Sequence, residues 1–177
     1  MSRFLSKASE SLLPYTPGEQ PQGRKFIKLN TNECPYPPSP KVAEAILAGY
    51  EENSSKIMPL ELANLRLYSD PEERVLIEAI ADHYGVGTNQ VIAGNGSDEI
   101  LGFAFRAFCD QNAPLQFADL TYGFYPALCG LYGIPFKVVP LEEDFTLNIE
   151  PYKNCGNNVI IANPNAPTGM NLPLSAI

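Results

Sequence analysis

A short segment that could hold an anion combines glycine, hydroxyl and acidic residues. Residues 94–99 (GNGSDE) follow an apolar run and precede a helical pattern. The glycines let the backbone approach a ligand closely, Ser97 offers a hydroxyl, and the start of a helix presents free N–H groups and a positive dipole end. These features suit a phosphate group. The alternative is an ordinary tight turn in which Ser97 caps the helix and Asp98 and Glu99 complement its dipole.

Two other segments expected at strand ends carry aromatic and amide side chains. In residues 120–126, Tyr122 offers a ring that could stack on a planar ligand, although its aromatics could equally be core residues. Residues 163–169 (NPNAPTG) combine prolines with asparagines that can form hydrogen bonds, or make only a rigid turn. Ligands of parallel sheets collect beyond the carboxyl ends of the strands. The three segments together predict a site for a phosphorylated, planar, aromatic molecule, and pyridoxal phosphate fits this description.

The elements that must position these segments indicate an α/β fold. Beyond residue 88, short apolar runs alternate with helical patterns, which is typical of β-α-β units and a mostly parallel sheet. We expect strands over residues 91–93, 115–118, 136–139 and 158–162, and helices over residues 97–109 and about 125–132. Before them, one helix is expected from Ser39, and another from Asp70-Pro71 to its stop at Gly85. Residues 172–177 are typical of a helix opening.

Proline placement indicates the organisation of the chain. The 177 residues include 17 prolines, of which seven lie before residue 41. We therefore expect residues 1–38 to form an arm and extended segment. Residues 39–177 are expected to hold the first helices and the first half of a ligand-binding α/β domain. A sheet of about four strands that ends at the start of a helix indicates an incomplete domain.

Composition excludes several classes of function. The chain has 12 Lys and Arg against 20 Asp and Glu, with a net charge of -8 and no basic block, so nucleic-acid binding is not expected. No signal peptide or membrane span is evident, and we expect a cytoplasmic protein that does not bind membranes. Cysteines without a CxxC pair and a single histidine predict no metal site, and the cysteines are interpreted as reduced and structural (Cys34, Cys109, Cys129 and Cys155).

Five segments resemble, in order and spacing, the histidinol-phosphate aminotransferases, which belong to the fold-type I pyridoxal-phosphate enzymes. The segments are residues 29–36 (LNTNECPY), 67–71 (LYSDP), 94–99 (GNGSDE), 121–125 (TYGFY) and 162–169 (ANPNAPTG). The resemblance runs from about Leu13 to the last residue. It implies an N-terminal arm and part of a large domain with a mostly parallel sheet and flanking helices.

The resemblance also implies roles for individual residues. Gly96, Ser97 and Asp98 would bind the cofactor phosphate, and Tyr122 would stack on the pyridine ring. Tyr68 would reach the cofactor phosphate of the neighbouring subunit, which implies a homodimer.

Other carried-over positions leave alternatives open. Tyr15 and Asn32 resemble positions near the substrate, but Tyr15 could instead anchor the arm and Asn32 could be a turn residue. Many relatives have asparagine where this chain has Ala166, and its amide contacts the oxygen on the cofactor ring. Alanine cannot donate that hydrogen bond, so either Asn165 binds the cofactor in its place or the contact is absent. No catalytic residue is expected within this chain, because the family's Schiff-base lysine would lie beyond Ile177.

The activity implied by the resemblance is transamination in histidine biosynthesis. L-histidinol phosphate and 2-oxoglutarate would give imidazole acetol phosphate and L-glutamate in the full-length parent, while this chain alone is expected to be inactive. A related threonine-phosphate decarboxylase or aromatic aminotransferase is an alternative. A different class is a non-catalytic module that binds a phosphate-bearing ligand or only assembles with a partner.

Overall fold

The computed structural model describes residues 12, 23, 27, 29, 31–44 and 68–177. The chain divides into two compact units, one of Met1–Thr16 with Gly94–Ile177 and the other of Pro17–Ala93. The three segments singled out for chemistry all belong to the first of these units. The described parts of each unit are considered separately below.

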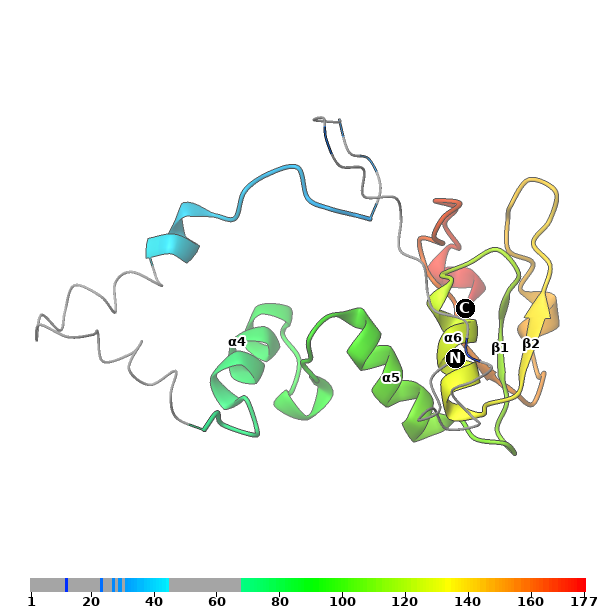
Figure 1. Cartoon of the computed structure of the whole chain (residues 1–177), viewed down its shortest axis with the longest axis horizontal. Helices are drawn as coiled ribbons and strands as arrows, with labels where there is room; N and C mark the ends of the chain where they lie inside the picture. The colour runs from blue at the N-terminus through cyan, green and yellow to red at the C-terminus, as the bar shows by residue number, and fades with distance from the viewer. Residues whose placement is uncertain (1–11, 13–22, 24–26, 28, 30, 45–67) are drawn as a thin grey trace, which may run out of the picture. The chain divides into compact units, whose positions relative to one another are not determined.

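The first unit contains a parallel sheet in the order β2-β1-β3, of which Figure 1 labels β1 and β2. The strands are β1 (Leu115–Ala118), β2 (Phe136–Val139) and β3 (Asn158–Val159). Both pairings of β1 are parallel, which confirms the predicted sheet type and the strands over residues 115–118 and 136–139. The strand predicted over residues 158–162 is too long, since the last backbone hydrogen bond to β1 runs from Ile160 N to Gln116 O at 3.1 Å.

The core of this unit lies between β1 and two helices, α5 (Ser97–Phe108) and α6 (Phe124–Tyr132). Every residue of β1 is buried, as expected of a central strand covered on both faces. Phe117 stacks on Phe136 with ring centroids 5.2 Å apart and meets Tyr125 edge-on at 5.7 Å. Gly133 ends α6 with φ 67°, a left-handed conformation that favours glycine. Both helices lie within about one residue of the predicted bounds.

A buried glutamine fixes β1 to the segment that precedes β3. Gln116 is fully buried, its Nε2 donates to Pro151 O at 2.9 Å, and its Oε1 accepts from Asn157 Nδ2 at 3.0 Å. Pro151 lies in the 3₁₀ helix η2 (Glu150–Tyr152). Because both polar atoms of the side chain form hydrogen bonds to distant parts of the chain, a polar residue is accommodated in the central strand.

The second unit holds α4 (Arg74–Tyr84) and the 3₁₀ helix η1 (Thr88–Gln90). The predicted stop at Gly85 is confirmed, with φ 66°. The predicted start at Asp70-Pro71 is wrong: the Asp70 carboxylate accepts from Glu72 N at 3.1 Å and from Arg74 Nε at 3.0 Å, so it closes a turn before the helix begins. The helix predicted from Ser39 is present over residues 40–44, and its continuation lies outside the described residues.

Two other predicted elements differ from the structure. Residues 91–93 were expected to form a strand, but they pair with no strand among the described residues, although Val91 has extended backbone angles. Sequence pattern indicates extended backbone, whereas a strand also needs a neighbour to pair with. At the end of the chain, where a helix opening was expected, the 3₁₀ helix η3 (Leu174–Ala176) forms.

Buried ionisable groups predict a loss of stability at alkaline pH. Burial raises the pKa of the Cys129 thiol from 9.0 to about 11, and burial together with the charge of Asp119 raises the pKa of Tyr152 from 10.0 to about 12. Above about pH 9 for Cys129 and about pH 10 for Tyr152, the unfolded chain ionises the group while the folded chain keeps it neutral, so unfolding becomes more favourable as pH rises. We expect the free energy of unfolding, measured with urea, to fall by about 2–4 kcal/mol between about pH 8 and pH 11.

The variant Tyr152→Phe separates one contribution to this slope. The Tyr152 hydroxyl of the wild type is buried without a hydrogen-bond partner among the described residues. Phenylalanine should therefore be tolerated and should stabilise the protein by about 1 kcal/mol at neutral pH. The variant should also lose stability less steeply above about pH 10. An identical alkaline slope in the variant would contradict the burial of this hydroxyl.

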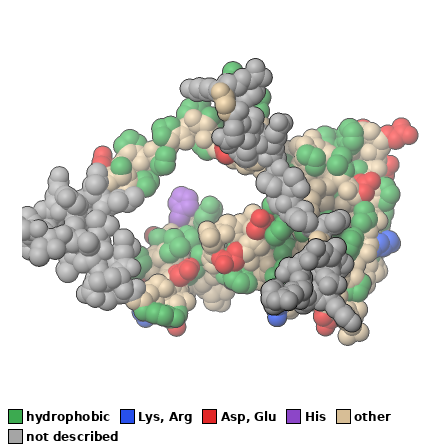
Figure 2. Space-filling model, in the orientation of Figure 1, with side chains coloured by type: hydrophobic (Ala, Val, Ile, Leu, Met, Phe, Trp, Pro, Cys, Tyr) green, Lys and Arg blue, Asp and Glu red, His purple; other side chains and the backbone are tan. Residues whose placement is uncertain are grey.

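The surface agrees with the acidic composition. Acidic side chains are scattered over the face shown in Figure 2, and its coloured residues include no patch of Lys and Arg. Within the described part of the chain, no helix is long and apolar enough to cross a membrane. No cluster of metal-ligating side chains is found in that part either.

Candidate functional site

The turn before α5 is built around a glycine with unusual backbone angles. Gly96 has φ 82° and ψ 168°, a region that is almost restricted to glycine. An added Cβ would meet no atom within 4 Å, so the space beside this residue is open. Gly96 N donates to Gly94 O at 3.0 Å, which tightens the turn. The backbone at this point is therefore accessible to a ligand.

The first turn of α5 offers backbone donors to an anion. No acceptor within the described residues faces the N–H groups of Ser97, Asp98 or Glu99, as expected at a helix N-terminus. Both acidic side chains of this turn are directed to protein donors instead. Glu99 Oε2 accepts from Asn95 N at 2.6 Å, and Asp98 Oδ1 accepts from Tyr122 Oη at 2.7 Å. The backbone amides are thus left for an anion, whose charge the helix dipole would favour.

Tyr122 lies beside this turn in the structure. Its hydroxyl donates the 2.7 Å hydrogen bond to Asp98, although the two residues are 24 positions apart in the sequence. The Tyr122 ring meets Tyr125 edge-on at 5.6 Å, and Tyr125 is a core residue of α6. Hence the structure brings together four predicted site residues: Gly96, Ser97, Asp98 and Tyr122.

Asn165 has a different environment, because it is buried and its side chain is fully hydrogen-bonded. Only 7% of the residue is exposed. Its Nδ2 donates to Leu120 O and to Thr168 Oγ1, both at 2.9 Å, and its Oδ1 accepts from Thr121 Oγ1 at 2.8 Å. A contact with a cofactor ring would require the side chain to give up some of these hydrogen bonds.

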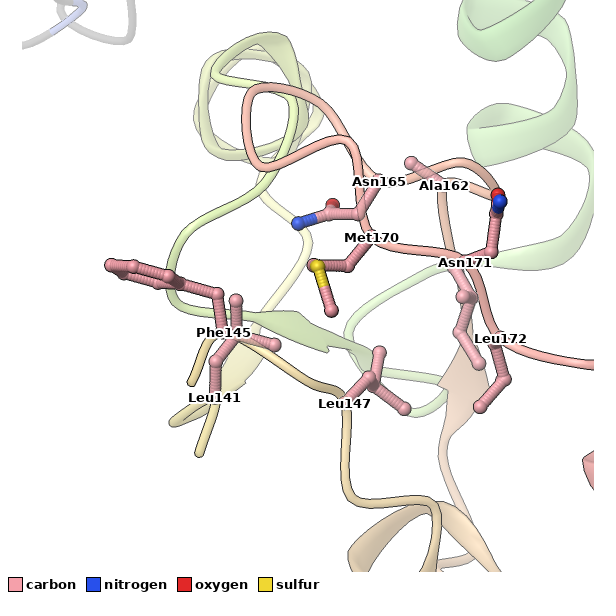
Figure 3. A pocket seen from close by; sticks show the side chains of 9 residues that line it. Leu141, Phe145, Leu147, Ala162, Asn165, Met170, Asn171 and Leu172 are labelled. Atoms are coloured by element: carbon pink, nitrogen blue, oxygen red, sulfur yellow. The ribbon is translucent and has the colours of Figure 1, made fainter. Parts of the chain in front are cut away.

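The loop that carries Asn165 is closed by a second asparagine. Asn163 donates from Nδ2 to Leu172 O at 2.8 Å and accepts from Leu172 N at 3.0 Å. Beneath the loop lies a small, mainly apolar cavity. Among the side chains that line it, Asn165 and Met170 lie between Phe145 on one side and Leu172 on the other (Figure 3). The cavity has room for about one water molecule, too little for a cofactor. The accessible site is therefore the turn beside Tyr122.

The remaining predicted site residues belong to other parts of the chain. Tyr68 is 95% exposed. Asn32 is also exposed and lies in a turn with φ 54°. Tyr15 lies outside the described residues. Tyr68 and Asn32 belong to the second compact unit, whereas the turn before α5 belongs to the first.

Sequence reasoning missed the residues that connect the loops. Thr121 and Thr168 bind the amide of Asn165 from two segments far apart in the chain, and Asn163 closes its loop. The available signal was the presence of short polar side chains at strand ends, where they commonly bind backbone and each other. Which of them pair across 44 residues depends on the tertiary fold.

The residues present fit the phosphate and the ring of pyridoxal phosphate. Open backbone at Gly96 and unpaired first-turn amides suit a phosphate, and the Tyr122 ring is held next to them. Among the described residues of this unit, the lysines lie elsewhere: Lys137 is on β2, and Lys153 Nζ binds Glu150 Oε1 at 2.6 Å.

Comparison with known proteins identifies relatives of the chain. The model of the family described as aminotransferase class I and II matches residues 24–177. A histidinol-phosphate aminotransferase of Pseudomonas putida is 49% identical over the whole chain, which covers 48% of that relative. Histidinol-phosphate aminotransferase 1 of Methylococcus capsulatus is 50% identical, with 46% of it covered. The chain thus spans about half the length of the curated relatives it matches.

Solved structures agree with this fold. The histidinol-phosphate aminotransferase of Sinorhizobium meliloti, solved in complex with pyridoxal-5'-phosphate, has a TM-score of 0.67 and 25% identity, with 94% of this chain and 44% of that chain covered. A putative histidinol-phosphate aminotransferase from Erwinia carotovora gives a TM-score of 0.68 at 26% identity, covering 84% and 41%. These similarities confirm the predicted fold class.

Proposed function

The chain belongs to the aminotransferase class I and II family, and on that premise we propose that it is the N-terminal part of a histidinol-phosphate aminotransferase. The whole protein would transfer an amino group from L-histidinol phosphate to 2-oxoglutarate in histidine biosynthesis, in the cytoplasm. The names of the relatives at 46–50% identity favour this substrate over those of a threonine-phosphate decarboxylase or an aromatic aminotransferase.

The observation that carries the proposal is the hydrogen bond between Tyr122 Oη and Asp98 Oδ1. It holds an aromatic ring beside the N-terminus of α5, where an anion would bind. One ligand that needs both a phosphate site and a ring-stacking surface is pyridoxal phosphate, which stabilises negative charge developing next to the reacting amino group.

Each residue of the site would then have a separate task. The Ser97 hydroxyl and the backbone N–H groups that follow Gly96 would donate hydrogen bonds to the phosphate oxygens. Tyr122 would cover one face of the ring and exclude water from it. Asp98 would bind through its backbone while its carboxylate orients Tyr122.

Other parts of the site would come from other segments of the chain and from a second subunit. Residues 39–177 would make the first half of the cofactor-binding domain and residues 1–38 an arm. In a homodimer, the exposed Tyr68 would reach the neighbouring cofactor phosphate, and Tyr15 and Asn32 would lie near the substrate. The lysine that binds the cofactor covalently would lie outside these 177 residues, in a part that corresponds to the other half of the relatives.

Removal of the Tyr122 ring should weaken cofactor binding. The probe is pyridoxamine 5'-phosphate, whose amine replaces the reactive aldehyde, so binding can be titrated without reaction at lysines. In the full polypeptide that the gene encodes, Tyr122→Ala should lower the affinity about tenfold, because the stacking surface is lost. Tyr84→Ala, at an exposed tyrosine of α4, is the control and should leave the affinity unchanged.

The same titration, together with an assay of transaminase activity, distinguishes the enzyme from a non-catalytic module. A full polypeptide that binds the probe and transaminates L-histidinol phosphate supports the proposal. A polypeptide that binds the probe but has no covalently binding lysine and no transaminase activity would be a non-catalytic phosphate-ligand module. Equal affinity of the wild type and of Tyr122→Ala for pyridoxamine 5'-phosphate would show that Tyr122 does not contribute to the binding site.

A further inference from the structure

Asn165 joins the loop of residues 163–172 to the segment that carries Tyr122. Its amide donates to Leu120 O, and its carbonyl oxygen accepts from Thr121 Oγ1. These two residues immediately precede Tyr122 in the chain. The remaining amide hydrogen goes to Thr168 within the loop of Asn165 itself. The Asn165 side chain therefore fixes the segment that immediately precedes Tyr122.

The two ends of Tyr122 are consequently held by different elements. Its backbone follows the two residues bound to Asn165, and its hydroxyl is bound to Asp98 at the start of α5. These two fixed ends define the long axis of the Tyr122 ring, and the edge contact with Tyr125 restricts rotation about that axis. A ring fixed before the ligand arrives loses less conformational entropy on binding, which increases affinity.

A direct contact between Asn165 and a ligand fits the structure less well. Asn165 is only 7% exposed. Both of its amide hydrogens and its carbonyl oxygen already have hydrogen-bond partners. Turning the amide outward would leave Leu120 O and the Thr121 and Thr168 hydroxyls without this partner, and these three hydrogen bonds are partly buried. Ala166, beside it, has no polar side-chain atom to offer in exchange.

We propose that Asn165 is a positioning residue that sets the Tyr122 ring for stacking through Leu120 and Thr121, and that it makes no contact with the cofactor. The proposal rests on the proposed function, because it assumes that Tyr122 stacks on pyridoxal phosphate. On this proposal, the cofactor contact that asparagine makes in many relatives is absent at Ala166, and Asn165 does not replace it.

A double-mutant cycle on cofactor affinity tests this proposal. The affinity of the full polypeptide for pyridoxamine 5'-phosphate is measured in the wild type, Asn165→Ala, Tyr122→Leu and the double variant. A positioning residue acts only through the ring that it positions. Asn165→Ala should therefore weaken binding about tenfold in the wild type and have almost no further effect in the Tyr122→Leu background.

A milder variant guards against misfolding. Thr121→Val keeps the shape of the side chain and removes only the hydroxyl that binds Asn165. It should weaken binding by about threefold, again only when Tyr122 is present, and its urea unfolding transition should stay cooperative. Asn148→Ala removes an exposed asparagine that binds Glu142 outside this loop, and should leave the affinity close to that of the wild type.

The possible results have distinct meanings. Losses from Asn165→Ala and Tyr122→Leu that multiply in the double variant would overturn the proposal in favour of direct contact between Asn165 and the cofactor. An Asn165→Ala variant that is less stable but binds normally would also overturn it, since the amide would then serve only the fold. Failure of the wild-type polypeptide to bind the probe would instead contradict the proposed function.

Discussion

Replacing Gly96 by alanine is expected to weaken binding of pyridoxamine 5'-phosphate by about 10- to 100-fold. The backbone angles of Gly96, φ 82° and ψ 168°, cost a residue with a Cβ about 1–3 kcal/mol. Since nothing lies within 4 Å of the added carbon, the cost is one of backbone conformation alone. Alanine relieves it by shifting the turn, which moves the amides of Ser97 and Asp98 away from the phosphate. The measurement is a binding titration of the full polypeptide.

Gly133→Ala is a matched control for this prediction. Gly133 also has a positive φ, 67°, and also has open space around the position of a Cβ, but it ends α6 and lies outside the candidate site. We expect this variant to lose about 1 kcal/mol of stability and to keep the affinity of the wild type. Equal losses of affinity in the two variants would show that the Gly96 effect is a general loss of stability.

Replacing Phe117 by alanine is expected to lower the free energy of unfolding by about 3–5 kcal/mol, the largest effect on stability that we predict. Phe117 is 3% exposed at the centre of the sheet and contacts the rings of Tyr125 and Phe136. Alanine removes most of a buried aromatic side chain and leaves a cavity that close-packed neighbours fill only partly. Urea unfolding of the wild type and the variant measures the difference.

Phe136→Ala provides the comparison within the same ring pair. Phe136 lies on the edge strand β2 and is 45% exposed, so its removal should cost about 1–2 kcal/mol. The ratio of the two effects reports burial, because the residue type and the partner ring are shared. Similar losses in both variants would contradict the position of β1 at the centre of the core.

The sequence predicts those features that depend on local pattern. The apolar runs at residues 115–118 and 136–139 and the glycine stops at Gly85 and Gly133 are governed by hydrophobic periodicity and backbone conformation, and the structure confirms them. The start of α4 was misplaced because the Asp70 carboxylate has two uses. It can cap a helix or close a turn, and its bond with Arg74 accompanies the turn.

The residues of the candidate site show the same division between local signals and tertiary contacts. Gly96, Ser97 and Tyr122 carry signals of residue type, namely open backbone, a hydroxyl and an aromatic ring at strand ends. The direction of the Asn165 side chain carries no such signal, because an asparagine in a loop can face a ligand or the protein. Its burial beneath the loop depends on Thr121 and Leu120, which tertiary folding alone brings near.

The most direct test of the account compares two ligands that differ only in the phosphate. The full polypeptide is titrated with pyridoxamine 5'-phosphate and with pyridoxamine, in the wild type and in Gly96→Ala. We predict saturable binding of the phosphorylated ligand by the wild type, much weaker binding of pyridoxamine, and a difference between the two ligands that largely disappears in Gly96→Ala. Equal binding of both ligands by the wild type, or binding of the phosphorylated ligand that Gly96→Ala leaves unchanged, would contradict the claim that the turn before α5 holds the cofactor phosphate.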